Sequence, residues 1–285
     1  MKIAVLSGKG GTGKTFISVN LACAEESAQS SSQAVYVDCD VEEPNGHLFL
    51  KPTNTEKRAV SVIVPEVDAA KCTACRKCVD FCRYNALAYV RERLLIFNEV
   101  CHSCEGCIIL CPAKALSRRK RAIGTVEEGL SDNLKVLTGC LNTGEVSGVP
   151  IIKELIKQLP ETGNAIIDCP PGSACIVMES IQKADYCLLV AEPTLFGVHN
   201  LSMVYELVKL FDKPVGVVLN KCILGEENPS EQFCKDNQIN IIEKISFDAE
   251  LGMLNSNGLV AVRESIHYKE LFQKMLDQLE KEVAQ

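Results

Sequence analysis

Short apolar runs of strand length alternate along this chain with longer segments whose apolar residues recur at helical spacing. The runs lie at 2–6, 34–38, 165–168, 186–191 and 215–219, and the helical patterns lie at 14–28, 150–159, 199–211 and 266–283. Strands that helices bury on both faces have this near-continuous apolar character. The alternation therefore predicts an α/β fold with a doubly wound, mostly parallel sheet. A Ser- and Gln-rich stretch at 27–33 is expected to form a loop.

Residues 66–118 break this alternation. They contain eight cysteines in two runs, and Cys72 of the first run aligns with Cys101 of the second at an offset of 29 residues. Ala86-Leu87 and Ala115-Leu116 follow the last cysteine of their runs at the same distance. The sequence therefore contains an internal duplication, which predicts two pseudo-symmetric halves in one small module.

This module interrupts the α/β body. We expect a discontinuous body of residues 1–65 and 119–285, with an inserted domain at 66–118. An insertion is best tolerated at a surface loop, so we expect loops at both of its ends. The basic run at 118–121 is expected to be a solvated turn, and a docking patch for an acidic redox partner is the alternative.

Composition and charge narrow the class of protein. With 47% hydrophobic residues in a chain of 285, the protein can bury a sizeable core and is not disordered. A net charge of −7 argues against a nucleic-acid partner. No apolar run approaches the ~20 residues of a membrane span, so no membrane association is expected. Sixteen cysteines without a signal peptide indicate a reducing, cytoplasmic location and metal-bound thiolates in place of disulfides.

A phosphate-binding loop is the clearest motif outside the insert. Residues 8–15 read Gly-Lys-Gly-Gly-Thr-Gly-Lys-Thr between a predicted strand and a predicted helix. Backbone N–H groups cradle phosphate in such a loop. Lys14 is predicted to reach the β- and γ-phosphates of ATP, and the Thr15 hydroxyl to bind Mg²⁺. The other nucleotide-binding positions are Gly8, Lys9, Gly10, Gly11, Thr12 and Gly13.

The extra lysine at position 9 makes this loop resemble the deviant Walker A motif of the MinD/ParA/Mrp/nitrogenase-iron-protein class. Three further segments agree with that class. Val37-Asp38-Cys39-Asp40 looks like its switch I, Ile167-Asp168-Cys169-Pro170-Pro171-Gly172 like its Walker B and switch II, and Val218-Leu219-Asn220-Lys221 like its adenine-recognising strand end. The resemblance covers essentially all of the body. It implies a homodimer that binds ATP or ADP and hydrolyses ATP slowly.

The resemblance also implies roles for individual residues. Lys9 would cross the dimer interface to the partner subunit's nucleotide, and Lys9, Lys14 and Asp40 would be the catalytic residues. Asp40 would orient the attacking water, and Asp168 would hold the Mg²⁺ shell. Asn220 would read the adenine edge. Phosphoryl transfer needs little beyond such positioning and charge compensation.

Several positions leave alternatives open. Asp38, like Asp40, is alternatively a solvated strand end. The class often carries a proline near the adenine, where residues 245–248 read Ile-Ser-Phe-Asp. Cys140 and Cys175 are candidates for a third, subunit-bridging cluster. The default interpretation of all cysteines outside the two runs is that they are small buried apolar residues.

The two cysteine runs resemble those of bacterial two-cluster ferredoxins. They read Cys72-x2-Cys75-x2-Cys78-x3-Cys82 and Cys101-x2-Cys104-x2-Cys107-x3-Cys111-Pro112. By the crossed ferredoxin pattern, Cys72, Cys75, Cys78 and Cys111 hold one [4Fe–4S] cluster, and Cys101, Cys104, Cys107 and Cys82 hold the other. The insert is therefore expected to be an α+β ferredoxin-like domain. A zinc site would leave the third and fourth cysteines of each run unexplained, and Arg83 stands where a proline is common.

The complete chain looks like a MinD-superfamily ATPase with an inserted ferredoxin domain. The first functional hypothesis is an ATP-gated electron carrier with two [4Fe–4S] clusters, Mg²⁺ and an unidentified redox partner protein. The second is an iron–sulfur cluster carrier resembling Mrp, which the absence of a C-x-x-C after Cys107 weakens. The third is a positioning ATPase resembling MinD or ParA, which the acidic residues at 264–285 weaken.

Overall fold

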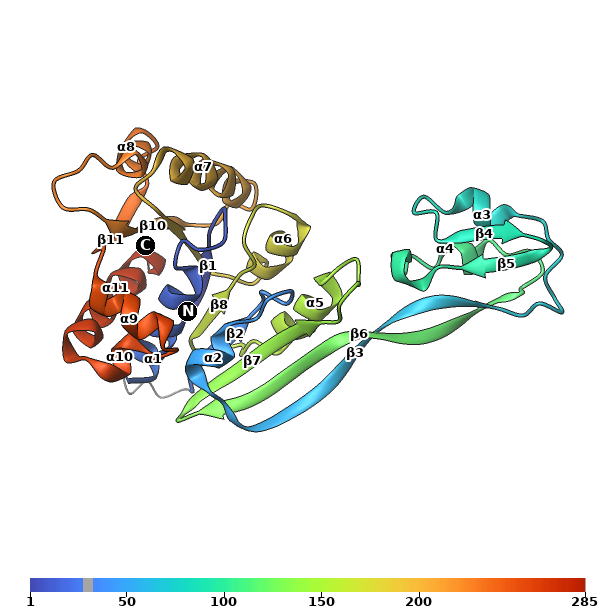
Figure 1. Ribbon diagram of the computed structural model, residues 1–285, viewed down its shortest axis with the longest axis horizontal. Helices are drawn as coiled ribbons and strands as arrows, with labels where there is room; N and C mark the ends of the chain where they lie inside the picture. The colour runs from blue at the N-terminus through green and yellow to red at the C-terminus, as the bar shows by residue number, and fades with distance from the viewer. Residues whose placement is uncertain (28–32, 285) are drawn as a thin grey trace.

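A nine-stranded sheet forms the body of the protein. The computed structural model describes residues 1–27 and 33–284. Seven parallel strands follow the order β11-β10-β9-β1-β8-β2-β7, and β6 and β3 extend the sheet antiparallel beyond β7 (Figure 1). The strands are β1 Lys2–Leu6, β2 Val35–Asp38, β3 Thr53–Val67, β6 Leu116–Ser131, β7 Leu134–Leu141, β8 Ala165–Asp168, β9 Tyr186–Ala191, β10 Val215–Cys222 and β11 Asn240–Ser246. The predicted strands and the mostly parallel α/β sheet are confirmed.

Helices cover both faces of this sheet. One face carries α5 Val149–Lys157, α6 Cys175–Ile181, α7 Leu195–Lys209 and α8 Pro229–Asp236. The other carries α1 Lys14–Ser27, α2 Gly46–Leu50, α9 Ala249–Ser256, α10 Ala261–Glu264 and α11 Ile266–Val283. Each predicted helix is present. The helix expected from residue 199 begins earlier, because Thr194 caps it by accepting from the Gly197 N–H at 2.9 Å. Most of the loop expected at 27–33 lies outside the described residues.

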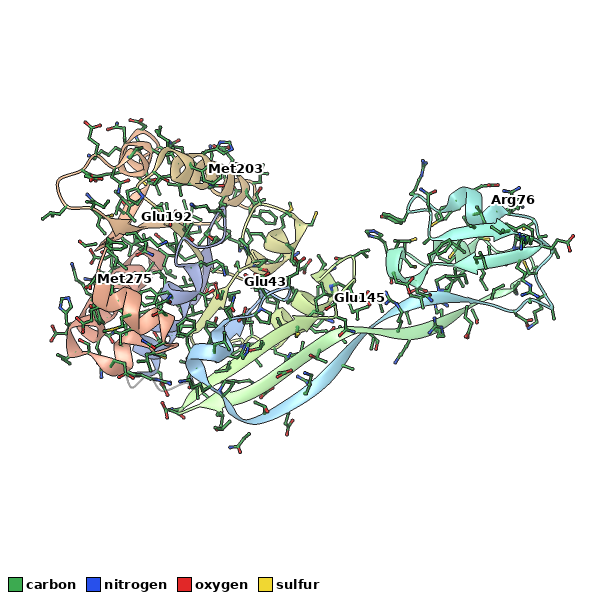
Figure 2. All side chains as sticks on the ribbon, in the orientation of Figure 1. Glu43, Arg76, Glu145, Glu192, Met203 and Met275 are labelled. Atoms are coloured by element: carbon green, nitrogen blue, oxygen red, sulfur yellow. The ribbon has the colours of Figure 1, made fainter. Side chains whose placement is uncertain are left out.

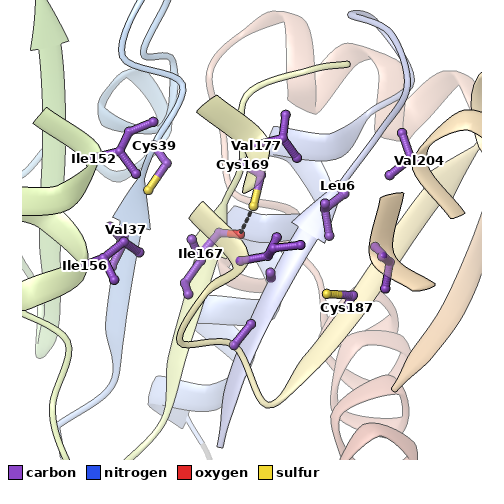
Figure 3. Close-up of a cluster of buried hydrophobic side chains, with 14 of the residues drawn as sticks. Leu6, Val37, Cys39, Ile152, Ile156, Ile167, Cys169, Val177, Cys187 and Val204 are labelled. Carbon is purple, nitrogen blue, oxygen red and sulfur yellow. Dashed lines mark hydrogen bonds between the residues drawn. The ribbon is translucent and has the colours of Figure 1, made fainter. Parts of the chain in front are cut away.

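The core between the sheet and the α5–α7 layer consists of aliphatic side chains and cysteines. Figure 3 shows Ile152, Ile156, Val177 and Val204 of the helices facing Leu6, Val37 and Ile167 of the sheet. Cys39, Cys169 and Cys187 fill the same layer, and burial raises the pKa of each of these thiols. These three cysteines therefore act as small apolar residues, as their default interpretation predicted.

A long two-stranded ribbon carries the insert. β3 and β6 remain paired well past the end of β7, up to Glu66 opposite Ser117 and Val67 opposite Leu116. Figure 1 shows the ribbon leaving the edge of the sheet and holding the insert at its far end. The expectation of surface loops at residues 66 and 118 is therefore wrong. The basic run at 118–121 is likewise part of strand β6, where it pairs with β3 along one edge, and is not a turn.

The insert is small and contains short elements. They are α3 Lys77–Phe81, β4 Leu87–Val90, β5 Arg93–Ile96, the 3-10 turn η1 Asn98–Val100 and α4 Gly106–Ile109. Its core is formed by Ala86, Leu87, Cys107 and Leu116, with six further cysteine or aliphatic side chains of the two runs packed at the margin. Within residues 1–27 and 33–284, every helix is too short or too polar to cross a lipid bilayer.

Candidate functional site

The phosphate-binding loop joins β1 to α1 at the carboxyl end of the parallel strands. A cavity of about 420 Å³ opens above it. Gly13 has φ +96°, and a Cβ there would lie 2.2 Å from the Asn220 side-chain nitrogen, so both the backbone conformation and the space require glycine. The residues that line the cavity include Ser7, Lys9, Gly10, Gly11, Gly13, Lys14, Thr15, Asp40, Glu43, Asn220, Lys221 and Phe247. The structure thus brings together most of the predicted nucleotide-binding residues.

A buried lysine and two carboxylates form the centre of this cavity. Lys14 Nζ lies 2.6 Å from Asp168 Oδ1 and 3.7 Å from Asp40 Oδ2. Burial acts to lower the pKa of Lys14, but the charge and hydrogen bond of Asp168, together with the charges of Asp40 and Asp38, outweigh it and the net shift is upward. The Lys14 ammonium is therefore charged, and the Asp168 carboxylate neutralises it. The family resemblance implies that a phosphate of the nucleotide contacts Lys14 in place of this carboxylate.

Two residues that the sequence patterns did not single out fix Asp168. Ser18 donates to Oδ1 at 3.1 Å, and Tyr36 donates to Oδ2 at 3.0 Å. Ser18 lies one turn after Lys14 on α1, so its spacing was a signal available in the sequence. Tyr36 lies within an apolar strand, and nothing local distinguishes it from a core residue. Together they hold both carboxylate oxygens in position beside Lys14.

Asp38 and Asp40 shape the segment that follows β2. The Asp38 carboxylate is fully buried and accepts from the N–H groups of Asp40 at 3.1 Å and Gly46 at 2.9 Å. The alternative of a solvated strand end is therefore wrong for Asp38. Burial raises the pKa of Asp40 to about 6. The positive charge of Lys14 opposes this upward shift of the pKa. Asp40 faces the cavity, next to where an attacking water would lie in the implied role.

In this structure the Lys9 side chain contacts residues of its own chain. Its Nζ lies 2.5 Å from Glu192 Oε2 and 5.2 Å from the centre of the Phe196 ring. Lys221 contacts the other oxygen of Glu192 at 2.7 Å and the Gly11 carbonyl at 2.7 Å. Burial acts to raise the pKa of Glu192, but the two lysines outweigh it and lower the pKa. Glu192, labelled in Figure 2, is a site residue that sequence reasoning missed.

Asn220 and residues 246–248 also line this cavity. Asn220 donates to the Thr12 carbonyl at 2.8 Å and accepts from the Lys221 N–H at 3.0 Å, so its amide ties β10 to the phosphate loop. The segment at 245–248 does line the cavity, through Ser246, Phe247 and Asp248. Phe247 is 70% exposed and offers a flat apolar face. An aromatic ring thus occupies the region where the class often has a proline.

Mg²⁺ fits this site only together with a phosphate ligand. Thr15, Asp40 and Asp168 supply the oxygen donors, and Lys14 Nζ lies 3.5 Å from the Thr15 hydroxyl. Across residues 1–27 and 33–284, no three His, Cys, Asp or Glu side chains converge on one ion. Mg²⁺ ordinarily binds one or two carboxylates plus substrate phosphates, which matches this donor set.

The two halves of the insert share one backbone conformation. Ala74, Arg76 and Asn85 adopt left-handed φ values of 56°, 59° and 53°. Ser103, Glu105 and Lys114, each 29 residues later, have φ values of 54°, 59° and 50°. α3 and α4 begin at the same offset, at Lys77 and Gly106. The duplication inferred from the sequence is therefore confirmed as a structural repeat.

One cysteine of the second run lies together with three cysteines of the first run. Cys72, Cys75, Cys78 and Cys111 line one small cavity. In each half a backbone amide donates to the fourth cysteine of its run: Ala86 to Cys82 Sγ at 3.3 Å, and Ala115 to Cys111 Sγ at 3.2 Å. Such bonds stabilise a thiolate.

The second predicted set contains the one buried cysteine of the two runs, Cys107. Burial raises the pKa of Cys107 to about 11, and Cys101 and Cys104 add to this shift. Cys82 and Cys101 pack at the margin of the same small core as Cys107. A protonated thiol must lose its proton when it ligates metal, so ligation here releases protons.

Cys140 and Cys175 lie on different elements. Cys140 is half-buried near the end of β7, and Cys175 is exposed at the start of α6. Neither joins a three-ligand group within the described part of the chain. A subunit-bridging cluster at these residues stays a prediction.

Known proteins match both the sequence and the fold. The family model described as the CobQ/CobB/MinD/ParA nucleotide binding domain matches residues 3–261. The uncharacterised protein MJ0578 of Methanocaldococcus jannaschii is 32% identical over 289 residues, covering 96% of this chain and 96% of that protein.

Two solved structures share the fold of the body. The cell division ATPase MinD of Pyrococcus furiosus has a TM-score of 0.61 at 22% identity and covers 98% of each chain. The septum site-determining protein MinD of Pyrococcus horikoshii OT3, complexed with Mg-ADP, has a TM-score of 0.61 at 18% identity. That match covers 98% of this chain and 96% of the other.

Proposed function

The chain belongs to the CobQ/CobB/MinD/ParA family of P-loop nucleotide-binding ATPases, and on that premise we propose that it is an ATP-gated iron–sulfur protein. In this proposal a homodimer binds Mg-ATP and hydrolyses it slowly. The nucleotide state then controls electron transfer through two [4Fe–4S] clusters in the ferredoxin-like insert. The physiological partner is a redox protein.

On the nucleotide side, the buried charges must change partners when ATP binds. Lys14, now neutralised by Asp168 at 2.6 Å, turns to the β- and γ-phosphates. Asp168 is then free to hold the Mg²⁺ shell with Thr15, while Ser18 and Tyr36 keep its carboxylate in place. Asp40 orients the attacking water. Lys9 leaves Glu192 and reaches the partner subunit's nucleotide.

On the insert side, the cysteines supply two sets of four thiolates. When bound, the two clusters provide one-electron transfer. The single observation that carries the proposal is that Cys111 lines the same cavity as Cys72, Cys75 and Cys78. A crossed set of this kind is what two-cluster ferredoxins use, and separate zinc sites have no need of it.

The test is metal analysis of protein purified without oxygen. Two cubes per chain require about eight iron and eight acid-labile sulfide. Electron paramagnetic resonance after dithionite reduction, with and without ATP, then reports whether nucleotide alters the reduced clusters. Stoichiometric zinc without sulfide would remove the iron–sulfur part of the proposal and leave only the ATPase.

Cluster carriage is the second candidate, and one observation favours it. Cys75 and Cys104, one in each predicted set, are exposed, so both cluster edges reach the surface. A carrier should pass iron and sulfide to an apo-ferredoxin within minutes, and ATP should change that rate. An electron carrier keeps its iron while reducing the same acceptor, so the iron content after mixing separates the two.

A further inference from the structure

One arginine joins the body, the ribbon and the insert. Arg121 lies on β6, opposite Val62 of β3, in the ribbon. Its guanidinium forms a bidentate ion pair with Glu145, with Nη1 2.5 Å from Oε1 and Nη2 2.7 Å from Oε2. Nη2 also donates to the Asn98 carbonyl of the insert at 3.0 Å. Figure 2 labels Glu145 beside the ribbon, between the body and the insert.

This junction is half-buried, and two of its polar atoms lack a hydrogen-bond partner among the described residues. The Arg121 side chain is 18% exposed and that of Glu145 is 9% exposed, so the pair is far better shielded than an ordinary surface ion pair. Within the described part of the chain, Arg121 Nε and Asn98 Oδ1 are buried without a hydrogen-bond partner. One is a donor and the other an acceptor, and they belong to the same junction. A small movement of the insert can therefore exchange one hydrogen-bond arrangement for another.

The Glu145 side of the junction leads to the nucleotide site. Glu145 lies in the segment 142–148, which begins where the Leu141 N–H donates to the Val41 carbonyl at 2.8 Å. At the other end of this segment, a Cβ on Gly148 would lie 2.3 Å from Val41 Cγ2 and 3.2 Å from Ile176 Cδ1 of α6. Val41 is fully buried and directly follows Asp40. Val41 therefore contacts both ends of the segment that holds Glu145, so a shift of Asp40 would be passed to both.

The Asn98 side of the junction leads to one cysteine run. The Asn98 carbonyl that accepts from Arg121 also accepts from the Cys101 N–H at 3.2 Å. Arg121 thus shares an oxygen atom with the turn that positions the first cysteine of the second run. Arg118, on the same strand, pairs instead with Glu105 inside the insert and does not reach the body.

We propose that the Arg121–Glu145 ion pair transmits nucleotide binding selectively to the Cys101 end of the insert. Asp40 and Val41 move segment 142–148, Glu145 carries Arg121 with it, and Arg121 alters the carbonyl that holds the Cys101 turn. The Cys72 end has no such link among the contacts described for Arg121. The inference rests on the proposed function in that ATP must bind at the phosphate loop, and its redox readout also requires the two clusters.

Hydrogen–deuterium exchange of the anaerobic holoprotein tests this proposal. A non-hydrolysable ATP analogue should change exchange at the Cys101 amide about fivefold or more, a usual size for coupling between sites. The equivalent peptide around Cys72 should not respond. In Glu145→Gln and in Arg121→Lys the response at Cys101 should disappear, while calorimetry still detects the analogue. Arg118→Lys is the matched control and should keep the response.

The outcomes separate this inference from the proposed function. A persisting response in both junction variants, or equal responses at Cys72 and Cys101, would overturn the selective link. Binding of the analogue with no response in the natural protein would overturn it as well. Failure of the analogue to bind at all would overturn the ATPase proposal together with it. Redox titration gives a second readout, since the nucleotide should shift the potential of one cluster only.

Discussion

Lys9 Nζ lies 2.5 Å from Glu192 Oε2 within a single subunit. Lys221 binds the other oxygen of the same carboxylate at 2.7 Å, so one anion holds two cations at the mouth of the nucleotide cavity. In the proposed dimer Lys9 reaches the partner subunit's nucleotide, which requires this ion pair to open. The Lys9 side chain is 28% exposed. A pair at such a position contributes at most about 1 kcal/mol.

Glu192→Gln is therefore expected to favour the dimer. It removes an interaction that dimerisation has to break, so ATP-dependent association should tighten by up to about fivefold. Sedimentation velocity at several protein concentrations, with a non-hydrolysable ATP analogue, measures this. Glu231→Gln, which removes a carboxylate that pairs with Lys235 and Lys244 on the surface, is the control and should change nothing. Weaker association of Glu192→Gln would show that Glu192 supports Lys9 in the dimer.

The two loop lysines should separate binding from dimerisation. Lys14→Ala removes the buried cation that faces the phosphates and should abolish nucleotide binding in calorimetry. Lys9→Ala should retain binding but lose ATP-dependent dimerisation and most turnover, because its target lies in the partner subunit. Undiminished turnover in Lys9→Ala would remove the case for a deviant Walker A enzyme.

Asp40 gives the protein a pH-dependent stability. Burial raises the pKa of the Asp40 carboxyl to about 6 in the folded state. A carboxyl with a raised folded-state pKa stabilises the fold fully below the unfolded value of about 4, and this contribution is lost as pH rises through 6. Asp40→Asn should therefore increase the free energy of unfolding at pH 7 by about 1–3 kcal/mol. Urea unfolding at pH 4 and pH 7 measures the difference, which should vanish toward pH 4.

Glu43→Gln is the matched control for this stability effect. Glu43 also lines the cavity, and its substitution should change the free energy of unfolding by less than about 0.5 kcal/mol. If Asp40→Asn did not increase the free energy of unfolding at pH 7, burial of the charged Asp40 carboxylate would not destabilise the fold, and the prediction would be contradicted. In the natural protein, kcat/KM for ATP should fall below about pH 6 as Asp40 becomes protonated.

Paired cysteine variants should reveal whether the cluster sets are crossed. If Cys111 belongs with Cys72, the double variant Cys72→Ala/Cys111→Ala damages a single cluster and keeps about four iron per chain. The double variant Cys101→Ala/Cys111→Ala then damages both clusters and loses nearly all iron. Iron and sulfide assays on anaerobic protein distinguish the two. The reverse order of iron contents would mean that each run holds its own cluster.

The body could be predicted from sequence because its strands are buried on both faces. Runs such as 186–191 contain no charged residue and read directly as parallel strands. The ribbon could not be found in this way. Its strands are exposed along much of their length, so residues 56–58 and 118–121 read as charged surface. Only the long ladder between β3 and β6 shows that they form a sheet.

The central residues of the candidate nucleotide site could also be predicted in part from the sequence. Lys14, Asp40 and Asp168 follow strand ends or a glycine loop, where parallel strands bring functional groups together. Glu192, Tyr36 and Arg121 act through contacts with residues distant in the sequence, and no local pattern marks them. Their roles depend on tertiary packing, which a single sequence does not display.

The most direct test of the account is the affinity for ATP in oxidised and in dithionite-reduced protein, measured by anaerobic calorimetry. If nucleotide binding and cluster reduction are coupled, linkage requires each to change the affinity or potential of the other by the same free energy. We predict affinities that differ about 5- to 150-fold between the two redox states. Equal affinities in protein that retains its iron would contradict ATP-gated electron transfer and would leave the insert merely tethered to the ATPase.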